Sequence, residues 1–227
     1  MPARRGAGRV GGAVLAGVLA GVLLAAGARG RDLDPNDFLA GGGPPKAKAR
    51  KADVPLVICG VCKLLAPVLR DLVQLKRDQL PRYKRLEEAT VQDLVEKKIC
   101  DPTAREGVWV TGVDLVEDEL EGELAVKDMG GPGQCGRECQ TVARACREIL
   151  DDHDIEVAEL LWKGVGADFE ETLCGEELSG ACANKPPPLP AGRPVGEPWE
   201  AKSAEDLKME QLLASVKGMP GMGNLQA

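Results

Sequence analysis

Apolar residues between positions 54 and 73 recur at spacings of three and four, which is the period of an amphipathic α-helix. Pro55 suits the first turn of this helix, whereas Pro67 falls inside it and predicts a kink or a break. The stripe, with the two residues that widen it, consists of Ile58, Cys62, Leu65, Leu69, Leu72, Val61 and Val68. We therefore expect order to begin near Val54, with Cys62 on the buried face.

Two more helices follow from the same period. Thr90 with Asp93 is typical of a capping box, and the helix behind it should end at Cys100, before Asp101-Pro102. A short helix around residues 83–89 is expected to run into it. The most regular stripe predicts one long third helix, with His153 on its apolar face; the members are Val142, Cys146, Ile149, Leu150, Val157, Leu160 and Leu161.

The period changes to two between residues 107 and 128. Alternation on both sides of the acidic residues 117–119 predicts a β-hairpin, and the glycine-rich loop at 129–133 ends it. A short fourth helix follows, with Phe169, Leu173 and Leu178 as its apolar residues and Cys174 and Cys182 near its end. The pattern is that of a mainly α domain with a hairpin insertion.

The N-terminal segment differs from this domain. Arg4, Arg5 and Arg9 precede an uncharged run that stops at Arg29, which predicts a secretory signal peptide over residues 1–28. An uncleaved anchor and an organelle transit peptide are the alternatives. Residues 29–53 are small, basic and turn-rich, so we expect a flexible leader.

The C-terminal segment is expected to be extended. Residues 184–202 predict a proline-rich spacer; its P-x-x-P at 187–190, with Arg193 nearby, also mimics a ligand of polyproline readers. Ser203 should cap a short amphipathic helix over 203–217, and 218–227 should be a flexible tail. The apolar side of that helix should dock on its own domain or serve as a client-binding hook; it comprises Met209, Leu212, Leu213 and Val216.

Charge narrows the choice of partners. Removal of residues 1–28 takes away three arginines and no acid, which changes the net charge from -7 to -10. We therefore expect no nucleic-acid binding and no attraction to anionic lipid through bulk charge. No later apolar run is expected to be long enough to span a membrane.

All eight cysteines lie after the leader, and their even number favours four disulfides in an oxidising lumen. Cys59 and Cys62 form a C-x-x-C, which also suits a redox site or a metal knuckle. Zinc fits poorly because the only histidine, His153, is far from that pair, and residues 151–154 lack the offsets of a calcium loop. No catalytic triad, phosphate loop or dinucleotide fingerprint is present, so we expect neither an enzyme nor a cofactor.

Several short segments together resemble one known family. They are Cys59-Gly-Val-Cys62, the helix end at 95–100, residues 145–154 and 157–161, Leu173-Cys174, Ala181-Cys182, and the tail segments 185–190 and 196–199. The chain is similar in these to the canopy or MIR-interacting saposin-like family, and to its plant-type members in particular. The resemblance implies a saposin-like disulfide-stapled domain over 54–183, with the hairpin 107–128 as an insertion.

The same resemblance implies the disulfide pairing. It pairs Cys59 with Cys182, Cys62 with Cys174, and Cys100 with Cys146, which leaves Cys135 for Cys139.

The function implied is that of a binding protein in the endoplasmic reticulum lumen or secreted from it, which assists folding or trafficking of protein clients. Saposin-type lipid binding and a thiol-disulfide oxidoreductase at Cys59 and Cys62 are the alternatives. The last residues, Gly-Asn-Leu-Gln-Ala, are not a retention signal, so residence in the endoplasmic reticulum would need a partner.

Overall fold

A computed structural model describes residues 47–118 and 122–217; of residues 211 and 213–217 it describes the backbone only. The predicted signal peptide, most of the leader, the hairpin tip and the tail lie outside the described residues. The chain divides into two units after Gly41, and everything below concerns the second unit.

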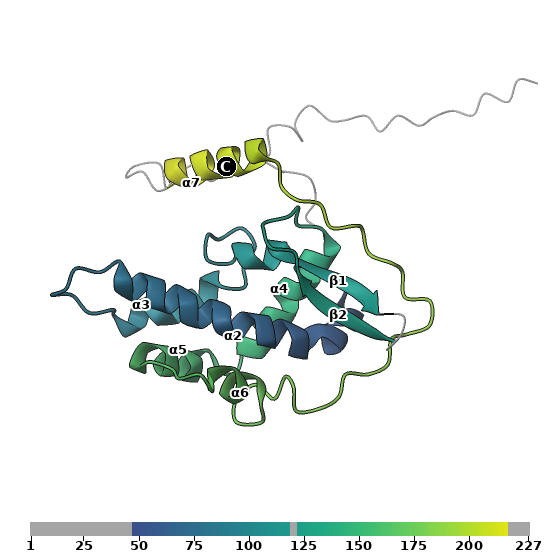
Figure 1. The fold of residues 1–227 in the computed structure, drawn as a ribbon, viewed down its shortest axis with the longest axis horizontal. Helices are drawn as coiled ribbons and strands as arrows, with labels where there is room; N and C mark the ends of the chain where they lie inside the picture. Colours follow the sequence, from purple (N-terminus) through teal and green to yellow (C-terminus); the bar gives the residue numbers. More distant parts are fainter. Residues whose placement is uncertain (1–46, 119–121, 218–227) are drawn as a thin grey trace, which may run out of the picture. The chain divides into compact units, whose positions relative to one another are not determined.

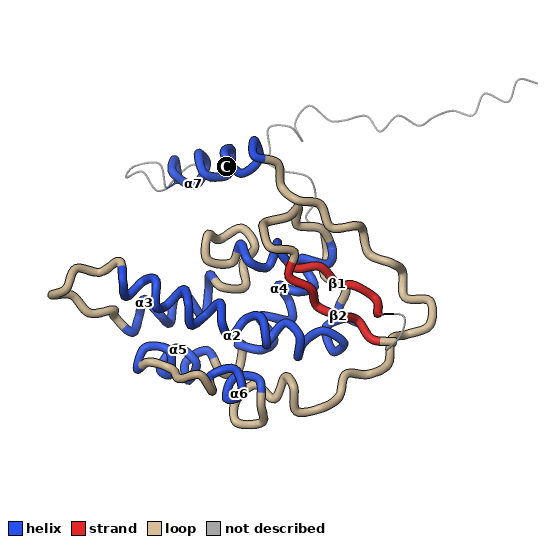
Figure 2. The backbone as a smooth tube through the Cα atoms, viewed as in Figure 1, coloured by secondary structure: helices blue, strands red, loops and turns tan. Residues whose placement is uncertain are grey.

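The second unit is mainly α-helical with one two-stranded sheet (Figures 1 and 2). Its elements are the 3-10 turn η1 (Lys51–Asp53), α2 (Val54–Asp78), α3 (Glu88–Asp93), the π-helical turn η2 (Leu94–Lys98), the 3-10 helix η3 (Val108–Gly112), β1 (Val113–Asp118), β2 (Glu123–Asp128), α4 (Arg137–Leu150), α5 (Asp154–Lys163), α6 (Phe169–Cys174) and α7 (Ala204–Lys217).

Helix α2 is the central element, and α4, α5, α6 and β2 all pack against it. Its fully buried stripe runs through Val57, Val61, Leu65, Leu69 and Val73. Of the predicted stripe, Val61, Cys62, Leu65 and Leu69 are buried, whereas Ile58, Val68 and Leu72 are half-buried. The helix continues through Pro67, so the expected break is absent.

By length and composition alone, the helical stretch Lys51–Asp78 is long and apolar enough to cross a membrane. The expectation that no later run could do so is therefore wrong. Half of its most apolar window is buried inside the domain, and the central helix of a folded core passes the same test of length and apolar content.

The second predicted helix begins earlier than its capping signal suggested. Helix α3 starts at Glu88, its N-cap is Glu87 and no side chain caps it, so the box at Thr90 is wrong. The predicted helix at 83–89 is also wrong, since residues 84–87 are irregular and Tyr83 is 84% exposed. This stretch lacks an apolar stripe whose packing could stabilise a short helix.

The predicted third helix is two helices, α4 and α5, separated by a turn at 151–153. Helix α4 packs mainly on α2, whereas α5 packs mainly on α3 and less on α2. His153 precedes α5, where its carbonyl accepts the N–H of Val157 at 2.9 Å. The prediction that His153 lies on one continuous apolar face is therefore wrong, because the periodic stripe belongs to two helices whose main partners differ.

The predicted hairpin is present over residues 113–128, with Val113 opposite Asp128 and Asp118 opposite Glu123. Residues 108–112 form η3 instead of extending the strand. The Thr111 hydroxyl donates to the Val108 carbonyl at 2.8 Å, and the Trp109 indole donates to Ile99 at 2.8 Å. Such local bonds compete with a β-ladder, which explains the shorter strand.

Gly60 lets the hairpin approach α2. A Cβ at position 60 would lie 2.6 Å from Cγ2 of Val126 in β2. We predict that Gly60→Ala lowers the free energy of unfolding by about 1–2 kcal/mol, because overpacking against a stiff side chain outweighs the gain in helix propensity. Urea denaturation would measure it. In a Val126→Ala background the loss should be smaller, because Cγ2 is removed and only the Cβ contact at 3.0 Å remains; a loss of equal size in both backgrounds would contradict the close approach.

Candidate functional site

The domain contains four disulfides: the three pairs that the family resemblance implies, and the pair that remains. The structure joins Cys59 to Cys182, Cys62 to Cys174, Cys100 to Cys146 and Cys135 to Cys139. No cysteine is free, and all eight lie in the described residues. The two cysteines of the C-x-x-C therefore bond to segments 123 and 112 residues away, not to each other.

Two of these bonds attach α6 and the turn after it to the first part of α2. Cys62 and Cys174 are buried, and the Ser179 hydroxyl donates to the Leu173 carbonyl at 2.5 Å within that turn. The N–H of Cys182 donates to the Cys174 carbonyl at 2.8 Å. The C-x-x-C thus holds the two ends of the helical domain together.

Residues 189–202, which we call the strap, run across the hairpin and the loop before α4. The N–H of Leu189 donates to Gly122, and that of Lys202 donates to Pro132 at 3.0 Å. The N–H of Gln134 donates to Glu200 at 2.8 Å. The prediction of a spacer over 184–202 is wrong for this part, because its backbone groups bond to the domain.

The strap makes two contacts that only glycine allows. A Cβ at Gly133 would lie 2.3 Å from the indole nitrogen of Trp199, which donates to the Thr111 carbonyl at 3.0 Å. A Cβ at Gly196 would lie 1.5 Å from a carboxylate oxygen of Glu138. Both surfaces therefore touch without room for a methyl group.

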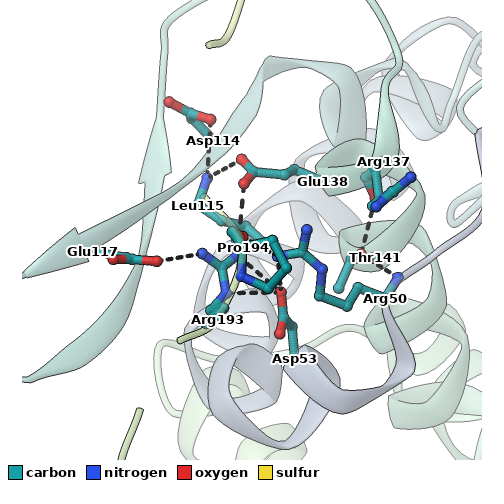
Figure 3. Close-up of polar contacts among 10 residues, drawn as sticks. All are labelled: Arg50, Asp53, Asp114, Leu115, Glu117, Arg137, Glu138, Thr141, Arg193 and Pro194. Atoms are coloured by element: carbon teal, nitrogen blue, oxygen red, sulfur yellow. Dashed lines mark hydrogen bonds and ion pairs between the residues drawn. The ribbon is translucent and has the colours of Figure 1, made fainter. Parts of the chain in front are cut away.

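Arg193 anchors the strap in a polar cluster (Figure 3). Its side chain is 4% exposed; Nε donates to Asp53 at 3.0 Å and Nη1 to Glu117 at 2.7 Å. Nη2 lies 3.6 Å from Glu138. Burial lowers the pKa of Arg193, but its hydrogen bonds to Asp53 and Glu117 outweigh this and raise the pKa overall. The cluster thus joins the strap to η1, β1 and α4.

The N-terminal side of the cluster corrects the predicted boundary of the leader. The side chain of Arg50 donates to Asp53 at 3.3 Å and to the Pro194 carbonyl at 2.6 Å. Its backbone N–H donates to the Thr141 hydroxyl at 2.9 Å. Order therefore begins at or before Arg50, and a flexible segment that extends to residue 53 is wrong.

Glu138, at the start of α4, has a pKa far from the ordinary value of a glutamate. Its pKa is raised to about 7, first because it is buried and then because the Asp114 carboxyl group lies beside it. The backbone N–H of Leu115 donates to it at 3.3 Å, and this bond together with the charge of Arg193 acts in the opposite direction. The same N–H donates to Asp114 at 3.1 Å, and Oε1 of Glu138 is buried without a hydrogen-bond partner in the described part of the chain.

A pocket of about 310 Å³ adjoins these carboxyl groups. Asp114 and Glu138 line one side, and the strap residues Glu197 and Trp199 line another. Among the residues that the structure describes, no group of three His, Cys, Asp or Glu side chains is placed to hold a metal ion.

Helix α7 follows the strap. Ser203 caps it, since its hydroxyl accepts the N–H of Asp206 at 3.1 Å. Met209 is 57% exposed, so the expectation that its side chain docks on the domain is wrong. The side chains of Leu213 and Val216 lie outside the described residues.

Comparison with known proteins gives no relative: no protein-family model, no curated protein and no solved structure matches the chain.

Sequence reasoning placed all eight cysteines among the structural residues but missed the polar cluster. Asp53 fell in the expected leader and Arg193 in the expected spacer, while Glu138 looked like an ordinary charge at a helix start. The one available signal was a lone arginine between prolines, in a segment otherwise free of basic residues from 186 to 201.

Loss of Arg193 should cost stability because it leaves Asp53 buried without its main partner. We predict that Arg193→Met lowers the free energy of unfolding by about 3 kcal/mol, and that adding Asp53→Asn recovers most of it. Denaturant titration would measure both. Glu117→Gln is the control, expected to cost less than about 1 kcal/mol because Glu117 is partly exposed. A stable Arg193→Met, or no recovery in the double variant, would contradict the assignment.

The disulfides should differ in how much they contribute to the free energy of unfolding, according to the length of chain that they close. In the loop-entropy account, removal of both long-range pairs, Cys59–Cys182 and Cys62–Cys174, should cost at least about 5 kcal/mol, because either pair alone still closes the long loop. Removal of Cys135–Cys139 should cost about 2 kcal/mol. Thermal unfolding of the two alanine variants, after non-reducing peptide mapping of the wild type, would test this order. Equal losses would show that closure of the long loop is not what stabilises the domain.

Proposed function

We propose that this chain is a saposin-like binding protein of the canopy type, which works in the secretory pathway lumen as a co-chaperone or adaptor for secretory or membrane clients. The observation that carries the proposal is the bonding of Cys59 and Cys62 to two distant segments. A C-x-x-C used in this way is a structural staple of a helical domain. Four disulfides without a free thiol are typical of an oxidising compartment.

The arrangement of apolar surface supports a closed protein-binding domain more than a lipid carrier. The stripes of α2, α4 and α5 contribute to one continuous core, with Leu65, Ile149 and Leu161 each at most 1% exposed. Lipid binding of the saposin type would need these helices to separate, and the strap, which is bonded to the hairpin and to Asp53, opposes this. The net negative charge of the predicted mature chain also disfavours anionic membranes.

The test is loss of the protein from cells that make it. Depletion should lower the amounts of a defined set of secreted or surface proteins at constant transcript levels, and the wild-type chain should restore them. The Cys135→Ala/Cys139→Ala variant should also restore them if it folds, whereas Cys62→Ala/Cys174→Ala should not. An unchanged secreted and surface proteome after depletion would overturn the proposal.

Two purified-protein assays separate the other functions. Delipidated protein should show no association with phosphatidylserine-containing vesicles from pH 4 to 7, whereas vesicle extraction would indicate the lipid carrier. Insulin reduction should be absent, whereas activity that is lost in Cys59→Ser would indicate the oxidoreductase.

A further inference from the structure

The loop that follows α2 concentrates positive charge in an acidic chain. Residues 76–85 contain five Lys or Arg and one acid, whereas the whole chain has 29 basic and 36 acidic residues. Residues 81–85 are all exposed, and within the described part of the chain Arg82, Lys84 and Arg85 form no ion pair. Three cationic side chains are therefore available to an anion from outside the molecule.

The loop is a formed turn that is tied to α5. The N–H of Lys84 donates to the Pro81 carbonyl at 2.8 Å, and the Trp162 indole donates to the Leu86 carbonyl at 2.9 Å. Tyr83 is 84% exposed in this turn. Tyr and Arg are enriched at protein interfaces, and a surface that is already ordered loses less conformational entropy when it binds.

A pocket of about 370 Å³ lies between the second half of α2 and the end of α5. Its apolar residues are Val73, Leu161 and Val165, of which the first two are buried. Its charged and polar residues are Arg70, Asp71, Gln74 and Arg77. Asp71 is the one acid among them, and it accepts from Nε of Arg70 at 3.1 Å. The pocket thus combines an apolar base with a rim that carries an excess of positive charge.

Arg77 connects the pocket to the loop. Its Nη2 donates to the carbonyls of Leu161 and Trp162, at 2.5 and 2.8 Å. Leu161 lines the pocket and Trp162 bonds to the loop, so the pocket and the turn are adjacent parts of one surface. This surface lies at the end of α2 that is away from Gly60 and the hairpin (Figure 1).

We propose that this surface, the pocket together with the turn 81–85, binds an extended segment of a partner protein in which acidic residues flank one apolar side chain. The apolar side chain lies in the pocket against Val73 and Leu161, and the flanking carboxylates pair with cations such as Arg82 and Lys84. Charge complementarity selects this occupant, because the rest of the acidic chain repels it. The inference rests on this surface alone and does not depend on the proposed co-chaperone role.

An anionic membrane fits the same surface less well than a peptide does. Glu87 and Glu88 follow the turn, Asp78 precedes it, and all three are exposed. A flat anionic surface that reaches the cations also meets these carboxylates, whereas a narrow peptide leaves them in water. Between residues 81 and 85, Tyr83 is the one exposed large apolar side chain.

Selection from a phage-displayed library of random peptides, each about twelve residues long, tests which chemistry the full-length protein takes. The enriched peptides should carry an excess of Asp and Glu around one large apolar residue. Labelled copies of these peptides then give dissociation constants by fluorescence anisotropy. Binding should weaken as the salt concentration rises, because the cations of the turn are exposed.

The loop variant Arg82→Gln/Lys84→Gln/Arg85→Gln removes three charges from exposed positions and breaks no ion pair. It should keep the far-UV circular dichroism of the wild type. The dissociation constants of the enriched peptides should rise by about tenfold, since each exposed ion pair contributes little and three are lost together.

Two further variants separate the site from the bulk charge. Lys63→Gln/Lys127→Gln/Lys208→Gln is the matched control, because it removes the same charge from exposed positions elsewhere; the dissociation constants should stay within about twofold of the wild type. Gln74→Trp fills the mouth of the pocket from an exposed helix position. It should weaken binding by about fivefold and remove the preference for an apolar residue.

Any of four results would overturn the proposal. The first is a selection without enrichment of acidic residues. The second is an equal effect of the loop variant and the matched control, which would assign binding to bulk charge. The third is wild-type affinity in Gln74→Trp. The fourth is association of the wild type with phosphatidylserine-containing vesicles that the loop variant loses, which would make the turn a membrane contact.

Discussion

The attachment of α6 and its following turn to the first part of α2 by two disulfides is the constraint on which the other features depend. It brings residue 182 back to the start of the domain, so the chain that follows leaves from beside η1 and the hairpin. The strap can therefore reach Asp53 and Glu138 with a short extended segment. Without those two bonds, the same segment would start from a helix that is not fixed to α2, and docking it would cost more loop-closure entropy.

The second level of organisation is electrostatic and is built on the first. Asp53, at the start of the domain, and Arg193, in the segment between α6 and α7, are both almost fully buried and bonded to each other. Burial makes such a pair intolerant of losing one partner. The cluster therefore fixes the path of the strap, and the strap in turn determines how much water reaches Glu138.

Much of this fold could be predicted from the sequence, and the parts that could not share a cause. Periodicity located α2, the hairpin and the long apolar stripe, because those signals are local. It merged α4 and α5, since a three-residue turn at 151–153 leaves the spacing of Val157 and Leu161 in phase with Cys146 and Ile149. The strap was read as a spacer because proline-rich composition reports an extended backbone and not whether that backbone has partners. The partners of Arg193 are between 55 and 140 residues away, and no local pattern encodes them.

The strap also determines how the domain would respond to a pull on α7. Its contacts lie in series along an extended segment, from Lys202 back through Trp199 and Arg193 to Leu189, so tension from the C-terminal side would detach them one after another. The extension would end at Cys182, where the bond to Cys59 passes the load directly into α2. Under tension the strap would therefore extend in steps, whereas the disulfide-bonded domain before Cys182 would not extend.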